Sequence, residues 1–347
     1  MVLSDNARLL HLAVHYTGNK STQEGIRLSN EVLRTDAVIK DLLLKYFISP
    51  FKMNEYFNFY HDADMKFNEV FNFAASIFDD KDTFFDQSVS LARHLYEQSN
   101  HPKIKGGEFY VAYLKDCLVD GEMMDAVGIF KSESRETYLK VYQSGQNFEI
   151  GSEDGININK LDKGCLIFNT EKEKGYMVAV VDTQSKGSEA RYWIDDFLHL
   201  KPREDEYFQT KNVLQMCKSF VMEKLPEDFE VNRADQAEYL NKSVKFFKEN
   251  ENFDIEDFAE EVMQNSSVIE SFKEYRKHYE TANDFSLNDS FDISDTAVKK
   301  QAKDFKSVIK LDSNFHIYIH GSRKNIERGY DEETGMYFYK LMFKEES

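Results

Sequence analysis

The chain has 347 residues, with 44 Lys and Arg against 62 Asp and Glu, so its formal net charge is −18. Hydrophobic residues make up 41% and aromatic residues 14%, which supplies enough apolar surface for packed cores and excludes a wholly disordered acidic chain. The net acidity also argues against a protein that coats DNA over its whole surface, because affinity for phosphates comes from Lys and Arg.

The cysteines Cys117, Cys165 and Cys217 are widely separated and form no CxxC pair, so the sequence predicts neither a disulfide framework nor a structural zinc site. This usage is typical of a reducing cytosol. No stretch approaches the roughly 18 apolar residues that span a bilayer, and the first residues form no continuous apolar run. We therefore expect a cytoplasmic protein with no membrane partner.

The length predicts two domains, and the elements change character near residue 203. We expect an α+β fold, in which residues 1–202 form a domain with a central antiparallel β-meander covered by helices. Residues 203–347 should form a mainly helical domain with a C-terminal helix, a β-hairpin and a small terminal β-sheet.

The first domain begins with a mixed pattern. Residues 9–16 form an apolar stretch that reads as a strand or a short helix. Asp36 is a good N-cap for an amphipathic helix that ends before Pro50, and two more helical stripes cover residues 67–78 and 89–96. The first segment should therefore alternate short strands with three helices.

From Gly106 the apolar pattern changes to that of strands. Residues 109–114 and 123–130 flank Asp120-Gly121, the two-residue signature of a type I′ hairpin turn. Further strands of the meander are predicted at residues 138–142, 148–150, 156–158, 165–168 and 176–181. The last run is apolar on both faces, which indicates a sheet covered on both sides.

The second domain shows helical periodicity first. Amphipathic helices are predicted over residues 213–221, ending before Pro226, over 237–247, after the N-cap Asp254, and over 268–279. From Ile293 onward the pattern predicts another helix, followed by strands at residues 315–319, 323–329 and 336–343.

Charge is segregated within this second domain. Between Glu249 and Asp295, fourteen acidic residues face three basic ones, a local net charge of −11, whereas residues 296–329 carry a net charge of +5. In the basic segment Lys299, Lys303, Lys306 and Lys310 follow the spacing of one helix face. Such a row is either the solvated side of an amphipathic helix or a face that contacts phosphates without reading bases. The candidate DNA-binding residues are Lys299, Lys300, Lys303, Lys306, Lys310, Arg323, Lys324 and Arg328.

Patterns that would indicate catalysis or metal binding are weak. His316 and His320 lie about 13 Å apart on one strand face, too far to share an ion, and His61 with Asp64 forms a short cluster of a kind common by chance. The acidic pairs 256–257 and 260–261 read mainly as a solvated helix face, and no phosphate-binding, nucleophile or zinc-protease motif occurs. We expect no catalytic residue, metal or cofactor, and no enzymatic activity. A minor alternative is that the protein is a metal-dependent enzyme with His61 and Asp64 at its active site.

Several segments, in order, resemble the bacterial family of 37-kDa nucleoid-associated proteins over nearly the full chain. They are residues 106–113 (GGEFYVAY), 126–133 (AVGIFKSE), 161–168 (LDKGCLIF), 253–261 (FDIEDFAEE), 309–316 (IKLDSNFH) and 329–336 (GYDEETGM). The Lys-, Glu-, Phe- and Tyr-rich composition is similar to a branch found in Bacteroidetes-type bacteria. The resemblance implies a cytoplasmic protein at the nucleoid that binds DNA with little sequence preference and has no enzymatic activity.

Two functional hypotheses follow. In the first, the chain is a nucleoid-associated protein that contacts DNA, double-stranded and without sequence specificity, through the basic C-terminal face. In the second, it is an acidic protein-interaction adaptor that a DNA-processing partner brings to the nucleoid, with residues 249–295 as the partner surface. In either case, the aromatic-rich fold is compatible with a symmetric homodimer.

Overall fold

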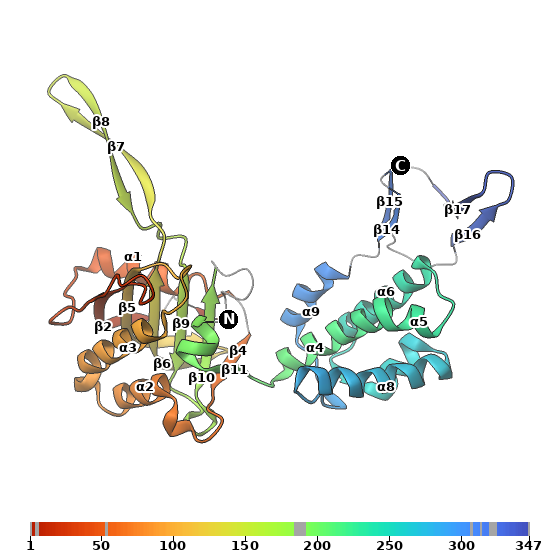
Figure 1. Cartoon of the computed structure of the whole chain (residues 1–347), viewed down its shortest axis with the longest axis horizontal. Coiled ribbons are helices and arrows are strands. Elements are labelled where there is room, and N and C mark those ends of the chain that lie inside the picture. The colour runs from red at the N-terminus through yellow and green to blue at the C-terminus, as the bar shows by residue number, and fades with distance from the viewer. Residues whose placement is uncertain are drawn as a thin grey trace. The chain divides into compact units, whose positions relative to one another are not determined.

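The computed structural model describes residues 2–3, 7–52, 55–183, 192–305, 308–312, 314–318 and 325–345. The chain divides into two compact units, Met1–Arg203 and Glu204–Ser347, hereafter unit 1 and unit 2 (Figure 1). Unit 1 contains the large antiparallel sheet and unit 2 is mainly helical, so the predicted α+β class is confirmed.

The sheet of unit 1 has the strand order β11-β4-β10-β9-β6-β5-β2-β3, with β1 beside β5. Its strands are β1 (Val2–Leu3), β2 (Arg8–Thr17), β3 (Ile26–Arg27), β4 (Tyr56–Phe59), β5 (Gly107–Val119), β6 (Glu122–Ser132), β9 (Lys163–Phe168), β10 (Met177–Asp182) and β11 (Leu200–Pro202). The hairpin β5–β6 turns at Asp120 and Gly121, and both have positive φ, as the predicted type I′ turn requires. The stretch 9–16 is therefore a strand, part of β2.

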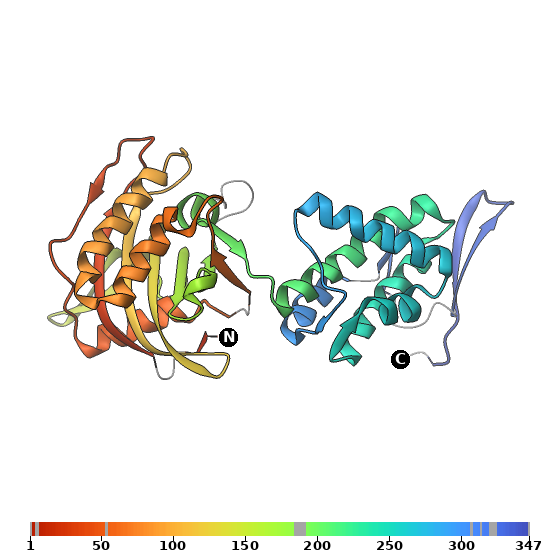
Figure 2. The ribbon, with the colours of Figure 1, turned by 90° about the horizontal axis from the view of Figure 1, so that it is seen from below.

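Helices cover both faces of this sheet. On one face lie α2 (Glu69–Asp79), α3 (Phe84–Gln98) and a π-helix (Tyr192–Leu198), and Figure 2 shows α2 and α3 side by side across the strands. The opposite face receives α1 (Ala37–Ile48), which begins at the predicted N-cap Asp36. Alternate residues of β10 belong to the two cores: Val178 to the first, Met177 and Ala179 to the second. This explains its uninterrupted apolar sequence.

Two predicted strands of the meander lie elsewhere. β7 (Glu136–Ser144) and β8 (Asn147–Gly155) pair only with each other in the described structure, as a ribbon that projects from unit 1 (Figure 1). The expected strand at 156–158 is wrong, because these residues return the chain from the ribbon to β9 through a turn. The meander thus runs β5-β6-β9-β10, with the ribbon inserted between β6 and β9.

Unit 2 has an aromatic helical core. Its main helices are α4 (Glu206–Ser219), α6 (Arg233–Glu249), α7 (Ile255–Phe258), α8 (Ser266–Asn283) and α9 (Asp295–Gln301). A π-helical turn (Phe220–Lys224) and α5 (Leu225–Asp228) prolong α4, so the helical run does not end before Pro226 as predicted. The proline stands in the first turn of α5, and the carbonyl of Val221, which lies five residues before it, accepts a hydrogen bond from the Gln236 side chain at 2.8 Å instead. A short ribbon, β12 (Asn252–Asp254) with β13 (Ser290–Asp292), completes the helical part.

Two hairpins follow the helices of unit 2. They are β14 (Val308–Leu311) with β15 (Phe315–Tyr318), and β16 (Ile326–Asp331) with β17 (Met336–Leu341). Ile309 of β14 is buried against Ala234 and Ala237 of α6, and Ile326 and Tyr339 pack on the same cluster. Both hairpins are therefore attached to the first half of α6.

The expectation that Lys299, Lys303, Lys306 and Lys310 lie on one helix face is wrong. Helix α9 ends at Gln301, a 3-10 turn covers Ala302–Asp304, and Lys310 lies on a strand. The apolar residues Val298, Phe305 and Ile309 of the same segment are nevertheless buried. The β-branched pair Val308-Ile309 favours a strand, and the cross-strand pair Ile309–Ile317 supplies packing that a continued helix would not have.

Candidate nucleic-acid interface

A groove of about 880 Å³ lies in unit 2 between the two terminal hairpins and the start of α6. Its basic side chains are Arg233 of α6, Lys310 of β14 and Arg328 of β16, and all three are exposed. Among the described residues that line it, Asp312 is the acidic one. The groove therefore has a local positive charge in a strongly acidic chain, and we call it the basic groove.

Aromatic rings lie between these cations. Phe315, Tyr337 and Tyr339 line the groove, and the guanidinium carbon of Arg328 stands 4.1 Å from the centre of the Tyr337 ring. Stacking on a ring face holds the planar guanidinium in place while its edge N–H groups remain able to donate. Guanidinium and ammonium groups held in place by aromatic rings suit a polyanion such as a phosphate backbone.

The position of Arg233 depends on the N-terminus of α6. Asn232 caps this helix, and its side chain accepts hydrogen bonds from the backbone N–H groups of Ala234 and Asp235 at 2.8 and 3.2 Å. Asp235 in turn accepts from the N–H of Asn232, which completes a capping box. These backbone donors are already satisfied, so the groove owes its positive charge to side chains.

The predicted DNA-binding residues separate into three groups. Lys310 and Arg328 meet at the basic groove. Lys299 and Lys303 are exposed at the end of α9 and in the following turn, whereas Lys300 is half-buried with its ammonium 5.9 Å from the ring centre of Tyr207 on α4. Lys306, Arg323 and Lys324 lie outside the described residues. Arg233 was not predicted, because it stands 77 residues before Lys310 and only the packing of β14 on α6 joins them.

The weaker chemical candidates have local structural roles. His61 Nδ1 accepts a hydrogen bond from the N–H of Ala63 at 3.2 Å, and Asp64 caps a 3-10 turn by accepting from the N–H of Lys66 at 2.9 Å. This second bond lowers the pKa of Asp64. Across the residues that the structure describes, no three His, Cys, Asp or Glu side chains are grouped so that they could hold a metal ion. His316 is exposed opposite Lys310 on the β14–β15 hairpin, and His320 lies outside the described part.

The three cysteines are free and buried in the described structure. Burial raises the pKa of Cys117 to about 12 and raises the pKa values of Cys165 and Cys217 further. These thiols therefore belong to the cores and are poorly suited to nucleophilic chemistry.

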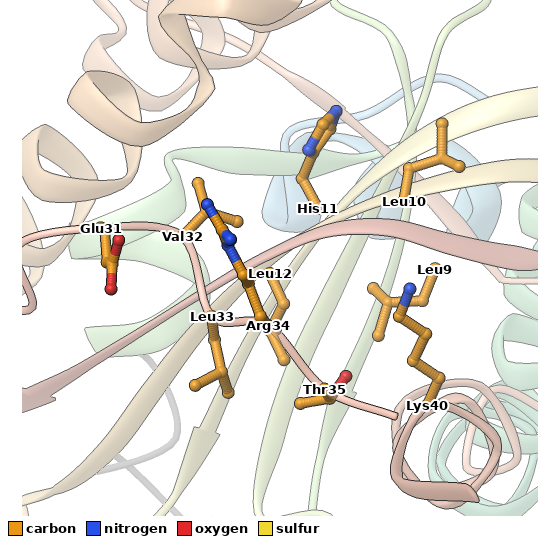
Figure 3. Close-up of a pocket in the computed structure, with 10 residues that line it drawn as sticks. All are labelled: Leu9, Leu10, His11, Leu12, Glu31, Val32, Leu33, Arg34, Thr35 and Lys40. Carbon is orange, nitrogen blue, oxygen red and sulfur yellow. The ribbon is translucent and has the colours of Figure 1, made fainter. Parts of the chain in front are cut away.

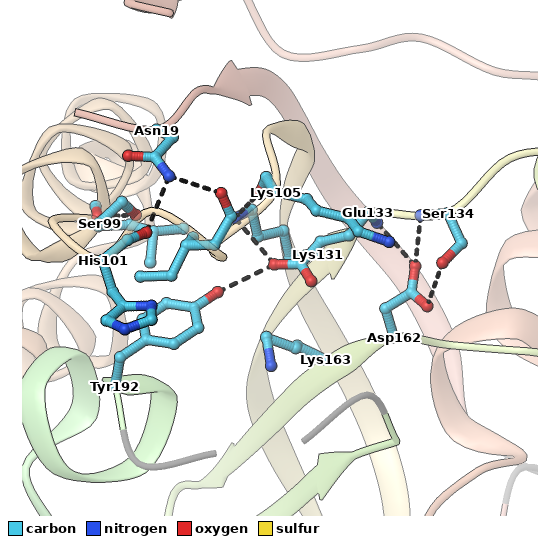
Figure 4. A network of polar contacts seen from close by, with 12 residues as sticks. Asn19, Ser99, His101, Lys105, Lys131, Glu133, Ser134, Asp162, Lys163 and Tyr192 are labelled. Atoms are coloured by element: carbon cyan, nitrogen blue, oxygen red, sulfur yellow. Dashed lines mark hydrogen bonds and ion pairs between the residues drawn. The ribbon is translucent and has the colours of Figure 1, made fainter. Parts of the chain in front are cut away.

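A buried polar network lies at the base of the β7–β8 ribbon (Figure 4). Lys131 is fully buried, donates to the carbonyl of Lys105 at 2.7 Å and pairs with Glu133 at 3.0 Å. Glu133 also accepts a hydrogen bond from the Tyr192 hydroxyl at 2.9 Å, and Lys163 pairs with Asp182 at 2.9 Å. Burial lowers the pKa of Lys131, while its pairing with Glu133 opposes that effect.

Asp162 completes this network where the ribbon leaves the sheet. Its carboxylate accepts hydrogen bonds from the N–H groups of Glu133 and Ser134 at 2.7 and 2.8 Å, and from the Ser134 hydroxyl at 3.0 Å. Each ammonium in the network has a carboxylate partner, so the arrangement holds the base of the ribbon in place. No sequence pattern predicts this network, because lysines are ordinarily exposed.

A comparison with protein-family models matches residues 13–338 to the family described as nucleoid-associated protein YejK. No curated protein matches this chain. In the described part of the chain, no helix combines the length and the apolar character needed to cross a membrane.

Proposed function

The chain belongs to the family of nucleoid-associated proteins, and on this premise we propose that it binds duplex DNA directly, with little sequence preference, through the basic groove. The observation that carries this proposal is the convergence of Arg233, Lys310 and Arg328 on one aromatic-lined groove. We place this activity at the nucleoid in the cytoplasm, and we propose no enzymatic reaction.

The charge distribution supports a localised contact. Guanidinium and ammonium groups that reach phosphates give affinity without reading sequence, because every nucleotide presents the same phosphate. The acidic segment 249–295 repels the polyanion elsewhere on unit 2, so DNA should be confined to the basic groove. The exposed lysines Lys299 and Lys303 can add outer contacts of smaller energy, since they are flexible point charges.

The salt dependence of duplex binding tests the groove. If three side chains each neutralise one phosphate, the logarithm of the binding constant should fall against the logarithm of salt concentration with a slope of about −2.7. Neutralising two of them in Lys310→Gln/Arg328→Gln should bring the slope to about −0.9. Fluorescence anisotropy with a labelled duplex of arbitrary sequence measures both.

The matched control is Lys245→Gln/Lys248→Gln, which removes the same charge from exposed positions at the far end of α6. This variant should keep the slope of the parent. If the groove variant and the control behave alike, the basic groove is not the binding site.

The acidic adaptor remains the second proposal. Exposed carboxylates at Glu260, Glu261, Glu270 and Glu274 lie on and around α8, where a basic partner surface could dock. Other acids of the segment are neutralised inside unit 2, since Lys273 pairs with Glu256 and Arg276 with both Glu280 and Asp289. Purified protein that fails to bind duplex DNA at low salt, yet co-purifies with a DNA-bound protein, would favour the adaptor over direct binding.

A further inference from the structure

The β7–β8 ribbon of unit 1 has two unlike faces. On one face the rings of Tyr138 and Tyr142 lie over Gly155 and Gly151, respectively. A Cβ atom built on these glycines would lie 3.4 and 3.8 Å from the nearest ring atoms. The same face carries the ion pair Lys140–Glu153 at 2.7 Å. The rings cover the two glycines, and the two charges of the ion pair neutralise each other. This face is therefore packed by residues of the ribbon itself.

The other face is apolar and uncovered. The cross-strand pairs Val141–Ile150 and Gln143–Phe148, with the neighbouring Leu139, place their side chains on it together. We call Leu139, Val141, Phe148 and Ile150 the arm face, and their exposed fractions are 77, 62, 74 and 70%. A two-stranded ribbon with an uncovered apolar face is at best marginally stable alone in water. Burial of this face against a partner would therefore stabilise the ribbon.

The charge of the ribbon excludes DNA as that partner. Residues 136–155 contain four acidic side chains and one lysine, a local net charge of −3, which repels phosphates. The ribbon is also held at its base by the buried network of Lys131, Asp162 and Tyr192, and it points away from its own unit (Figures 1 and 4). Its partner is therefore a protein surface with apolar and basic side chains.

Unit 1 carries such a surface itself. The first turns of α1 and the preceding loop expose Leu33, Val38, Ile39 and Leu42, and we call these residues the docking surface. They are exposed because α1 buries only its last turn, at Tyr46, Phe47 and Ile48, against the sheet. The apolar spacing of α1 predicts a helix correctly, but half of that stripe has nothing to pack on.

A groove of about 460 Å³ adjoins this surface (Figure 3). Leu9 and Leu12 of β2 and Leu33 give it apolar walls, and Arg34 and Lys40 bring positive charge. Among the described residues that line it, Glu31 is the acidic one, so their local net charge is +1, whereas that of the ribbon is −3. The polarity and charge of the docking surface and this groove thus complement those of the ribbon.

We infer that two copies of the chain form a symmetric homodimer in which the arm face of each packs on the docking surface of the other. The contact is reciprocal, as two-fold symmetry requires. This inference is independent of DNA binding, because it uses residues of unit 1 alone.

The area of the ribbon favours packing of each arm face on the docking surface of the other copy over packing of the two arm faces on each other. Strands of nine residues are about 30 Å long, and two of them are about 10 Å wide, so one face covers about 300 Å². Two reciprocal contacts bury about 1,200 Å² in total, the lower limit for a specific interface, whereas two arms packed on each other bury about half of that.

Sedimentation equilibrium of the full-length protein tests the dimer. The parent should be dimeric at concentrations of about 10 to 100 µM. Phe148→Ser/Ile150→Ser on the arm face and Val38→Ser/Leu42→Ser on the docking surface should each weaken the dimer at least about a hundredfold, because both symmetric contacts lose apolar burial. Lys140→Ser/Glu149→Ser, which alters the opposite face of the same ribbon, is the matched control and should remain dimeric.

A mixture of the two variants distinguishes the modes of association. The intact arm of the docking-surface variant can pack on the intact surface of the arm variant, so the mixture should dimerise more tightly than either variant alone. A cooperative melting transition in each variant shows that it is folded. A parent that stays monomeric at about 100 µM overturns the inference. So does an arm variant that remains dimeric, or a docking-surface variant that does, since the latter result indicates arm-to-arm pairing.

Discussion

The β7–β8 ribbon of unit 1 and the terminal hairpins of unit 2 share a backbone geometry but differ in the side chains that they present. The ribbon of unit 1 offers Leu139, Val141, Phe148 and Ile150 in an acidic setting. The hairpins of unit 2 surround Lys310 and Arg328 with aromatic rings and pack on α6. A β-hairpin thus specifies no partner by itself. Its exposed side chains, and the elements that pack against it, decide whether protein or nucleic acid binds.

The largest expected effect separates the two regions. Arg233→Glu/Lys310→Glu/Arg328→Glu changes the basic groove by six unit charges, so duplex affinity at low salt should fall roughly a thousandfold. The same variant should sediment as the parent does, because unit 1 is unchanged. Conversely, Phe148→Ser/Ile150→Ser should retain its affinity for a short duplex that admits one unit 2. Loss of both properties in either variant would show that the two regions act as one site.

Acid should destabilise unit 1 through His15. Burial lowers the pKa of His15 to about 4, and its ring accepts a hydrogen bond from the N–H of Ser29 at Nδ1, with Nε2 3.0 Å from the Ser88 hydroxyl. The unfolded chain takes up this proton near pH 6.5, so the stabilisation is complete above that pH and is lost as the pH falls toward 4. The expected loss is about 3 kcal/mol at most.

Thermal unfolding followed by fluorescence measures this effect, because Trp193 is the single tryptophan of the chain and is buried in the core of unit 1. In the His15→Asn variant the free energy of unfolding should decline less between pH 6.5 and 4 than in the parent. The control His316→Asn, at an exposed position of unit 2, should decline as the parent does. Parallel curves for the parent and His15→Asn would contradict this role.

A smaller effect concerns the ring beneath Arg328. Tyr337→Ala removes the face on which the guanidinium stacks and should weaken duplex binding about tenfold. Tyr337→Phe keeps the ring and should bind as the parent does. Equal losses in the two variants would assign the effect to the hydroxyl and not to the stacking.

The smallest effect is expected at the lysines outside the basic groove. Lys299→Ala/Lys303→Ala removes two exposed charges that do not line the groove, and duplex affinity should change about two- to threefold. An effect as large as that of the groove variant would identify Lys299 and Lys303, and not the basic groove, as the principal contact with DNA.

Features that depend on residues a few positions apart can be predicted from the amino-acid sequence. The N-cap Asp36 begins α1, Asp120-Gly121 turns β5 into β6, and the doubly apolar run 176–181 requires cover on both faces of the sheet. The segregation of charge between residues 249–295 and 296–329 is likewise a property of the sequence. Capping, turn geometry and alternation are local, so they can be predicted without knowing the fold.

Which distant residues come into contact depends on the tertiary packing. Arg233 joins Lys310 and Arg328 because Ile309 is buried against α6, and the row of lysines is broken because β14 finds a partner in β15. The strands β7 and β8 leave the meander because Asp162 and Lys131 fix the chain where β6 ends, a role that no periodicity reveals. Contacts of this kind depend on the free energy of packing between segments far apart in sequence, and the basic groove is made by them.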